Sequence, residues 1–95
     1  MDSTTREDLI TGYRPDAGQI TMFTTSWCGY CRRLKAQLSR AEIGFHEVNI
    51  EDDESAADLV VALNAGNRTV PTVLFADGSA ATNPSIAEVT ERAAG

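Results

Sequence analysis

The two cysteines of this chain, Cys28 and Cys31, lie in the stretch Thr24-Thr25-Ser26-Trp27-Cys28-Gly29-Tyr30-Cys31. The stretch falls where an apolar run ends and a helical pattern begins, so a strand-to-helix turn is expected to carry both thiols. Two thiols at Cys-x-x-Cys spacing can close a small disulfide, exchange thiols with a partner, or supply half of a metal site. The fold must therefore suit one of these three roles.

The composition limits the classes of protein to which the chain can belong. Its 95 residues, 42% of them hydrophobic, fit one small soluble globular domain. A net charge of −6 argues against non-specific nucleic-acid binding. Two cysteines are too few for a secreted disulfide framework, and we see neither a signal-peptide pattern nor an apolar run of membrane length. We expect a cytoplasmic protein without membrane or nucleic-acid partners, where a Cys-x-x-Cys pair is more often catalytic or metal-binding than structural.

Residues 1–18 differ in pattern from the rest of the chain. This segment is polar and is broken by two glycines and one proline, although Leu9, Ile10 and Tyr13 could form one amphipathic turn. We expect it to be a mobile extension or a loosely docked arm. Residues 19–95 then form the working domain.

Hydrophobic periodicity predicts an alternation of strands and helices after residue 18. Strands are expected at 19–24 and 45–50, and helices at 30–41 and 53–64. The first helix places Cys31, Leu34 and Leu38 on one face, and Gly44 is expected to end it. Alternation of this kind predicts two parallel strands joined by a right-handed crossover.

The remainder of the chain adds a hairpin and a last helix. Pro71 cannot donate to a β-ladder, so the next strand is expected only after it, at 73–75. Asp77-Gly78 predicts a turn to a short strand at 80–82, and a helix follows over about 85–93. The whole pattern predicts an α/β fold in which a mixed four-stranded sheet carries three helices on its faces.

Two helix starts have recognisable caps, and both are ambiguous. Either Asp53 or Ser55 can cap the second helix. Either Asn83-Pro84 or the capping box Ser85-x-x-Glu88 can begin the last helix.

The helical pattern makes the two cysteines chemically unequal. Cys28 is expected at the N-terminal end of the first helix, where free N–H groups and the helix dipole favour the thiolate, the nucleophilic form. The nearby Arg32 and Arg33 can add to this effect. Cys31 lies on the apolar face, where burial disfavours its ionised form. We therefore expect Cys28 to be the exposed attacking sulfur and Cys31 the buried resolving one.

A resident metal site is the weaker interpretation of the cysteine pair. Structural zinc sites use four ligands, whereas this chain offers two cysteines and one histidine, His46, on a separate predicted strand. We therefore predict no metal ligands. An Fe–S cluster would need a dimer or external thiols to complete its ligand set, and this alternative stays open.

Together with Thr69-Val70-Pro71, the stretch Trp27-Cys28-Gly29-Tyr30-Cys31 resembles the glutaredoxin branch of the thioredoxin superfamily. The resemblance implies a thioredoxin-like (glutaredoxin) fold over residues 19–95. It also implies a cis peptide bond before Pro71 that brings the backbone of Val70 beside the active sulfur. The N–H and C=O of Val70 would then pair with the backbone of a bound thiol, as neighbouring strands pair.

Within that branch the chain is most similar to the actinobacterial mycoredoxins, which use mycothiol, a cysteine-containing pseudodisaccharide. The similarity rests on three motifs: Asn67-Arg68-Thr69-Val70-Pro71-Thr72-Val73, Phe75-Ala76-Asp77-Gly78-Ser79 and Thr82-Asn83-Pro84-Ser85. Glutathione-using members commonly carry Gly-Gly-x-Asp where this chain has Ala81-Thr82-Asn83-Pro84, and neutral side chains there suit a sugar ligand. The resemblance implies these substrate-binding residues beside the catalytic cysteines: Trp27, Tyr30, Arg68, Thr69, Val70, Pro71, Thr82 and Asn83. Asn83-Pro84 can equally be only a helix cap.

The resemblance implies a thiol-disulfide oxidoreductase that reduces mixed disulfides between proteins and mycothiol by a monothiol mechanism. Cys28 would be the nucleophile, and Cys31 would be resolving or protective. We expect no tightly bound cofactor, with mycothiol as co-substrate. Expected partners are S-mycothiolated proteins and, indirectly, mycothiol disulfide reductase. We expect the protein itself to be a monomer. The alternatives are a thioredoxin-like dithiol redoxin reduced by a flavoprotein reductase, an Fe–S cluster carrier, and a zinc-binding interaction module.

Overall fold

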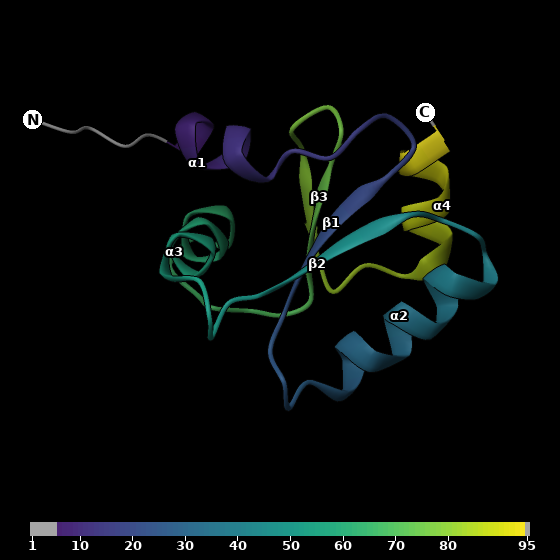
Figure 1. Ribbon diagram of the computed structural model, residues 1–95, viewed down its shortest axis with the longest axis horizontal. Helices are drawn as coiled ribbons and strands as arrows, with labels where there is room; N and C mark the ends of the chain where they lie inside the picture. The colour runs from purple at the N-terminus through teal and green to yellow at the C-terminus, as the bar shows by residue number, and fades with distance from the viewer. Residues whose placement is uncertain (1–5, 95) are drawn as a thin grey trace, which may run out of the picture.

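The computed structural model describes residues 6–94 and places a four-stranded sheet between helices on both faces (Figure 1). The elements are α1 (Arg6–Tyr13), β1 (Ile20–Thr24), α2 (Gly29–Arg40), β2 (Phe45–Asn49), α3 (Glu54–Leu63), β3 (Thr72–Phe75), β4 (Ala80–Thr82) and α4 (Ile86–Ala94). Every predicted strand and helix is present, with its ends within one residue of the expected position. The prediction of three helices was wrong by one, because α1 precedes the sheet.

The sheet has the predicted mixed topology. Its strands lie in the order β2-β1-β3-β4, with β1 parallel to β2 and antiparallel to β3. β4 returns antiparallel to β3, as the Asp77-Gly78 turn predicted. The thioredoxin-like fold expected from the resemblance is therefore confirmed.

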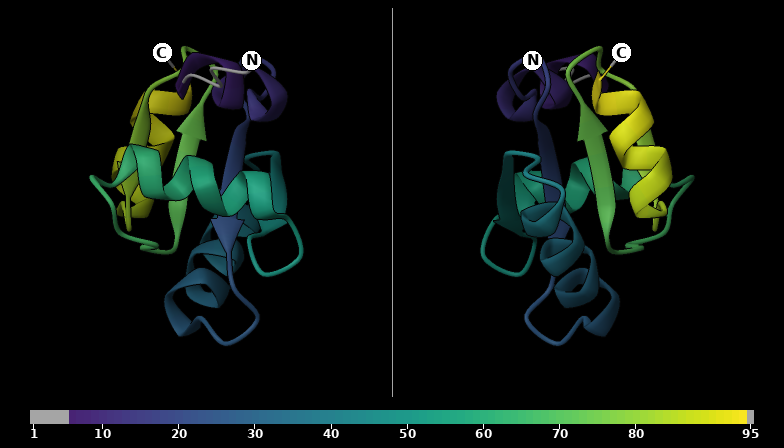
Figure 2. Two further views of the ribbon diagram at one scale, coloured as in Figure 1. Left: turned by 90° about the vertical axis from the view of Figure 1, so that its left-hand side faces the viewer. Right: turned by 90° about the vertical axis from the view of Figure 1, so that its right-hand side faces the viewer.

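Two apolar layers cover the two faces of the sheet. On one face, Cys31, Leu34 and Leu38 of α2 and Val89 of α4 form a core with alternate residues of β1 and β3. On the other face, α3 packs against Phe23 and Leu74. Figures 1 and 2 show α2 and α4 on one side of the sheet, with α1 and α3 on the opposite side. Because successive side chains of a strand point to opposite faces, β1 and β3 contribute residues to both cores and are buried along their whole length.

The helix caps resolve the ambiguities left by the sequence. Asp53, not Ser55, caps α3, because its Oδ1 accepts a hydrogen bond from the N–H of Ala56 at 3.2 Å. Ser85 caps α4 through a hydrogen bond from the N–H of Glu88 to its Oγ, at 3.1 Å. The carboxylate of Glu88 pairs instead with Arg92, so only half of the predicted capping box forms.

The end of α2 differs from the prediction, which assigned the stop to Gly44. The residue with left-handed backbone is Glu42, at φ 58°. The N–H of Ile43 bonds to the C=O of Leu38, and the N–H of Glu42 bonds to the C=O of Ser39. This is a Schellman motif, in which the apolar residue after the turn, Ile43, packs on the core. Packing of Ile43 thus fixes the helix end although glycine is absent from the turn.

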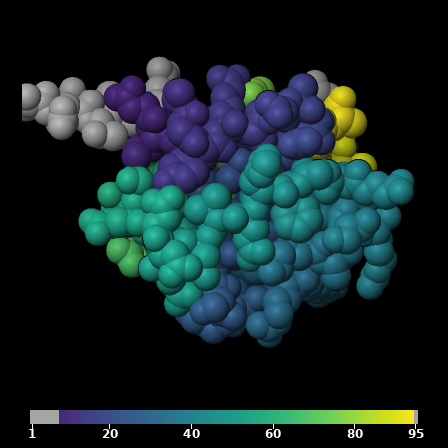
Figure 3. Space-filling model, viewed as in Figure 1, coloured from purple at the N-terminus to yellow at the C-terminus, as the bar shows by residue number. Residues whose placement is uncertain are grey.

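The segment before the sheet is docked from residue 8 onward, and residues 1–5 lie outside the described part of the chain. Leu9, Ile10 and Tyr13 all pack on the core beneath α3. The Tyr13 hydroxyl donates a hydrogen bond to Oδ2 of Asp53 at 2.6 Å. The backbone C=O of Tyr13 accepts a hydrogen bond from the Thr21 hydroxyl at 2.5 Å. Figure 3 shows this N-terminal segment lying directly against α3. The domain boundary at residue 18 stays a prediction.

Within the described part of the chain, no helix has both the length and the apolar character needed to cross a bilayer.

We predict that Tyr13→Phe lowers the free energy of unfolding by about 1.5–3 kcal/mol, the range for a hydrogen bond to a charged group. The variant keeps the ring, whose centroid lies 5.6 Å from that of Phe23, and loses only the bond to Asp53. Urea denaturation at pH 7 measures the difference. Tyr30→Phe, at an exposed ring, is the matched control and should leave stability unchanged.

The same hydroxyl gives the wild-type protein a dependence on alkaline pH. Burial, with the hydrogen bond to Asp53, raises the pKa of Tyr13 from 10.0 to about 12. A raised folded-state pKa means that the stabilisation is complete below pH 10 and is lost as the pH rises through about 12. Tyr13→Phe should lack this part of the decline, and identical pH profiles for the two proteins would contradict the prediction.

Candidate active site

Cys28 is the N-cap residue of α2. Its backbone is extended, with φ −87° and ψ 108°, and its Sγ accepts a hydrogen bond from the N–H of Cys31 at 3.1 Å. Cap residues satisfy N–H groups that the first helical turn leaves free. Here the capping atom is sulfur, so the helix N-terminus points its positive end at the predicted nucleophile. This arrangement favours the thiolate of Cys28 over the thiol.

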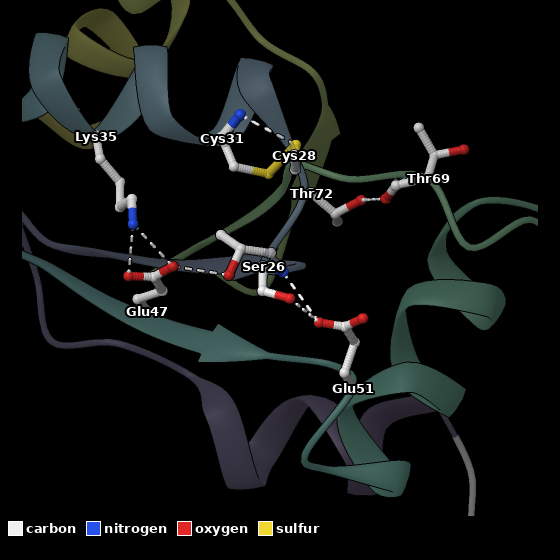
Figure 4. Close-up of a disulfide and its surroundings, with 9 residues drawn as sticks. Ser26, Cys28, Cys31, Lys35, Glu47, Glu51, Thr69 and Thr72 are labelled. Atoms are coloured by element: carbon white, nitrogen blue, oxygen red, sulfur yellow. Dashed lines mark hydrogen bonds and ion pairs between the residues drawn. A yellow bond between two sulfur atoms is a disulfide. The ribbon is translucent and has the colours of Figure 1, made fainter.

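The two cysteines are joined by a disulfide (Figure 4). In this oxidised form Cys28 is 5% exposed and Cys31 1% exposed. The prediction of an exposed Cys28 was therefore wrong, although Cys31 is the deeper of the two, as expected. The cause is that both residues belong to the core between α2 and the sheet.

The two arginines after the cysteines have different surroundings. A Cβ atom added at Gly29 would lie 3.9 Å from Nη2 of Arg32, so the guanidinium of Arg32 folds back over the first helical residue. Arg33 instead lines a groove with residues of α4. Arg32 is thus the arginine placed to add positive charge at the helix N-terminus.

The segment Thr69-Val70-Pro71 has the conformation implied by the resemblance. The Val70–Pro71 peptide bond is cis, and Pro71 is fully buried. Among residues 6–94, neither the N–H nor the C=O of Val70 has a hydrogen-bond partner. The side chain of Val70 packs against both cores, including the one that contains the cysteines. Val70 therefore offers an unpaired backbone edge to an extended ligand.

A side-chain network that sequence patterns do not reveal supports this segment. The Asn64 amide donates to the C=O of Val60 at 2.8 Å and to Oγ1 of Thr72 at 2.9 Å. The Thr72 hydroxyl in turn donates to the C=O of Thr69 at 2.7 Å. The sequence pattern only places Asn64 at the end of the helix predicted over 53–64, and nothing in a linear pattern shows that its side chain points at β3. The network fixes the backbone immediately before Val70.

Asn64 also binds the side chain of Thr82, one of the residues predicted to bind substrate. The hydroxyl of Thr82 donates to Oδ1 of Asn64. Thr82 lies on β4 and is therefore engaged within the protein. Its neighbour Asn83 is different: its N–H bonds to the C=O of Pro71 at 2.7 Å, while its side chain lines the groove beside α2.

Two carboxylates hold the turn that carries Cys28 (Figure 4). Glu51, from the β2–α3 connection, accepts from the N–H of Ser26 at 3.0 Å and from its hydroxyl at 2.7 Å. Glu47 on β2 accepts from the hydroxyl of Thr24 at 2.8 Å and pairs with Lys35 of α2 at 3.1 Å. Both carboxylates join elements on either side of the cysteine turn.

The electrostatics agree with these contacts. The hydroxyl and N–H of Ser26 hold the pKa of Glu51 below its ordinary value. Burial acts to raise the pKa of Glu47, but hydrogen bonds from Thr24 and Lys35 outweigh it and leave the pKa lowered. Both groups are therefore carboxylates at neutral pH.

Four predicted ligand-binding residues are exposed. Trp27 is 72% exposed and Tyr30 65%, and they are the exposed large apolar side chains of the described chain. Arg68 and Thr69 are exposed in the segment before Val70. Trp27 and Tyr30 flank Cys28 in sequence, so a molecule that approaches the sulfur meets aromatic surface.

A groove of about 310 Å³ opens beside Tyr30, between α2 and the start of α4. Its lining residues are Tyr30, Arg33, Leu34, Gln37, Asn83, Pro84, Ser85 and Ile86. Of these, only Tyr30 and Asn83 were predicted as ligand-binding. The helical pattern places Arg33 and Gln37 away from the apolar face of α2, and the position of α4 opposite them cannot be inferred from that pattern.

The histidine lies elsewhere. His46 is on the edge strand β2 and lines a separate cavity with Tyr13 and Thr21. Across residues 6–94, no three His, Cys, Asp or Glu side chains converge to hold a metal ion. The absence of metal ligands stays a prediction.

We predict that Glu51→Ala frees the cysteine turn. The amide of Ser26 should exchange with solvent several-fold faster in the variant, because it loses its hydrogen-bond acceptor. Hydrogen exchange followed by NMR at pH 7 measures this. Asp52→Ala is the control, since this neighbouring carboxylate makes no contact within the described residues. Equal exchange rates in the two variants would contradict the assigned role of Glu51.

In wild-type protein the same bond should weaken in acid. Because the pKa of Glu51 is lowered in the fold, its contribution is complete above the ordinary carboxyl value and is lost as the pH falls through the lowered one.

The chain was compared with proteins of known family and with solved structures. The family model described as Glutaredoxin matches residues 20–80. A Mycobacterium tuberculosis protein named as a putative glutaredoxin is 59% identical over 70 residues, covering 74% of this chain and 83% of that protein. Mycoredoxin 1 of Corynebacterium glutamicum is 44% identical over 70 residues, covering 74% and 86% of the two chains.

A solved structure agrees with the fold. Glutaredoxin from Archaeoglobus fulgidus superposes with a TM-score of 0.69 at 21% identity, over 90% of this chain and 92% of that one. With the family model spanning both the cysteine pair and the cis-proline segment, the chain belongs to the glutaredoxin family and is a glutaredoxin-like thiol-disulfide oxidoreductase.

Proposed function

We propose that this protein reduces mixed disulfides between proteins and mycothiol through Cys28 alone. The observation that carries the proposal is the Cys28 sulfur, which caps α2 and accepts the N–H of Cys31. A thiolate stabilised in this way attacks a disulfide and also leaves readily when it is displaced. Both properties are needed when one cysteine performs the whole cycle.

The cycle consists of two exchanges. The Cys28 thiolate attacks the mycothiol sulfur of the mixed disulfide. A bond forms between these two sulfurs, the old disulfide breaks, and the client protein leaves as a thiolate that takes up a proton. A second mycothiol, as its thiolate, then attacks the mycothiol sulfur held on Cys28. This releases mycothiol disulfide and regenerates the Cys28 thiolate, so one free mycothiol is consumed per turnover and the disulfide bond passes from the client protein to mycothiol.

The unpaired backbone of Val70 supports the binding step. An extended thiol ligand can form strand-like hydrogen bonds with the N–H and C=O of Val70 while its sulfur meets Cys28. The exposed Trp27 and Tyr30 rings flank that position.

Two observations favour mycothiol over glutathione as the thiol: the uncharged residues just before α4, and the similarity to a protein named Mycoredoxin 1. Pro84 occupies the position where glutathione-using members carry an aspartate. Within the described chain, no carboxylate lines the groove beside it. The related Corynebacterium glutamicum protein is named Mycoredoxin 1. Mycothiol disulfide reductase would regenerate the reductant, and the cytoplasm is the expected compartment.

A second mechanism is favoured by one observation, the disulfide between Cys28 and Cys31. In a dithiol cycle Cys31 would attack the Cys28 mixed disulfide, and a flavoprotein reductase would reduce the resulting pair. In the monothiol proposal this disulfide is a side product that shields Cys28 from further oxidation.

We predict that Cys28→Ser abolishes reduction of a mycothiolated peptide and that Cys31→Ser retains most of it. The hydroxyl of serine is not ionised at neutral pH and cannot exchange with a disulfide, whereas the monothiol cycle does not use Cys31. Turnover is followed as NADPH consumption coupled through mycothiol and its reductase. Loss of turnover in Cys31→Ser would establish the dithiol route.

The thiol itself is tested by mass spectrometry. After incubation with mycothiol disulfide, the adduct mass should appear on Cys28, and it should form faster than the adduct from glutathione disulfide. Preferential modification by glutathione would overturn the choice of mycothiol.

We predict that Asn64→Ala weakens substrate binding and destabilises the fold by about 1–3 kcal/mol, since it removes two partly buried hydrogen bonds and an exposed third one. Loss of its amide frees Thr72 and the C=O of Thr69, so KM for the mycothiolated peptide should rise more than kcat falls. Asn67→Ala is the control, because its side chain makes one long bond of 3.4 Å. An Asn64→Ala effect confined to stability would contradict the assigned role.

A further inference from the structure

We propose that the groove between α2 and α4 binds the hydroxyl-rich part of the low-molecular-weight thiol, with Arg33 and Gln37 as specificity-determining residues. This inference rests on the proposed function and extends it. It assigns a neutral polyol ligand to side chains remote in sequence from the Thr69-Val70-Pro71 segment.

One wall of the groove is a stripe along α2. Tyr30, Arg33 and Gln37 recur at i, i+3 and i+7, and therefore lie one above another on the same side of the helix. Tyr30 lies between the two cysteines in sequence, so the stripe begins at the active site and runs away from it. The guanidinium of Arg33 and the amide of Gln37 follow in turn.

The other wall is the start of α4 and is tied to the thiol-docking segment. Asn83 bonds through its N–H to the C=O of Pro71, the residue that follows Val70. One end of the groove is thus bounded by Tyr30 and Asn83, next to both parts of the active site. A ligand whose sulfur is bonded to Cys28 can extend from there between the helices. The volume, about 310 Å³, lies at the lower end of the range for small-ligand sites.

The polar side chains of the groove have hydrogen-bonding capacity to spare. Within residues 6–94, the side chains of Tyr30, Arg33, Gln37 and Asn83 make no hydrogen bond or ion pair. Together they offer donors and acceptors in planar groups, which suit the paired hydroxyls of a sugar or cyclitol.

The other residues that line the groove favour a polyol over the charged amino end of a peptide such as glutathione. Leu34 and Pro84 are buried and supply apolar surface, against which the C–H face of a sugar ring can pack. No acidic side chain lines the groove, so an α-ammonium group would have no partner there. A neutral ring with hydroxyls along its edge satisfies both the apolar and the polar lining.

The experiment compares two substrates that share the reacting sulfur. One is a peptide joined by a disulfide to mycothiol, and the other is the same peptide joined to N-acetylcysteine, which lacks the sugar and the cyclitol. Steady-state kinetics are measured for wild-type protein, Arg33→Ala/Gln37→Ala and Arg40→Ala. Arg40 is the matched control, an exposed arginine on α2 outside the groove.

For the mycothiol substrate, the double variant should show a KM about fivefold to thirtyfold above wild type, the effect of losing one or two hydrogen bonds, with kcat little changed. For the N-acetylcysteine substrate, the change in kcat/KM should be less than twofold. Arg40→Ala should match wild type on both. Equal losses on both substrates, or no loss on either, would overturn the inference.

Arg33→Gln separates a neutral ligand from an anion, because it keeps hydrogen-bond donors and removes the charge. It should retain more than half of the wild-type kcat/KM on the mycothiol substrate. A loss as large as that of the single variant Arg33→Ala, measured beside it, would overturn the assignment of a neutral ligand. Thermal denaturation verifies that each variant is folded. A wild-type protein that does not turn over the mycothiol substrate would overturn the proposed function and this inference together. Wild-type turnover with an unaffected double variant would overturn the inference alone.

Discussion

The hydrogen bond from the N–H of Cys31 to the sulfur of Cys28 joins the fold of this protein to its chemistry. It exists because β1 ends at Thr24 and α2 begins at Gly29, so that Cys28 occupies the cap position between them. A serine or aspartate would cap the helix as well or better. Cysteine is a weaker cap, and the helix N-terminus instead stabilises the charge on sulfur that disulfide exchange requires. The Cys28 sulfur thus caps the helix and is also the reactive atom.

The turn around Cys28 is held from outside its own sequence. Glu51 fixes Ser26 from the connection after β2, and Asn64 fixes the residues before Val70 from the end of α3. These residues contact neither sulfur, yet they set the positions of the two segments between which a thiol must fit. A reactive pair on a short turn reaches a defined geometry only when such supporting contacts are present.

The element order, the sheet topology and the inequality of the cysteines were predictable because they follow from periodicity and from cap positions. Side-chain contacts between distant segments were not. α1 was missed because its sequence is mostly polar and its stability comes from Tyr13 meeting Asp53, 40 residues away. The left-handed residue after α2 was assigned to Gly44 on propensity, whereas packing of Ile43 places Glu42 there. Arg33 and Gln37 resemble solvent-facing residues until α4 is placed opposite them.

The ion pair between Lys35 and Glu47 has a consequence for how the molecule avoids unwanted association. β2 is an edge strand, and an edge strand with free backbone groups can recruit strands from other molecules and seed aggregation. Charged and polar side chains at Glu47 and His46 make that edge a poor template, and the opposite edge, β4, is only three residues long. An incoming extended chain is therefore discouraged at both borders of the sheet. The unpaired backbone of Val70 belongs instead to the segment that packs against the core containing the two cysteines.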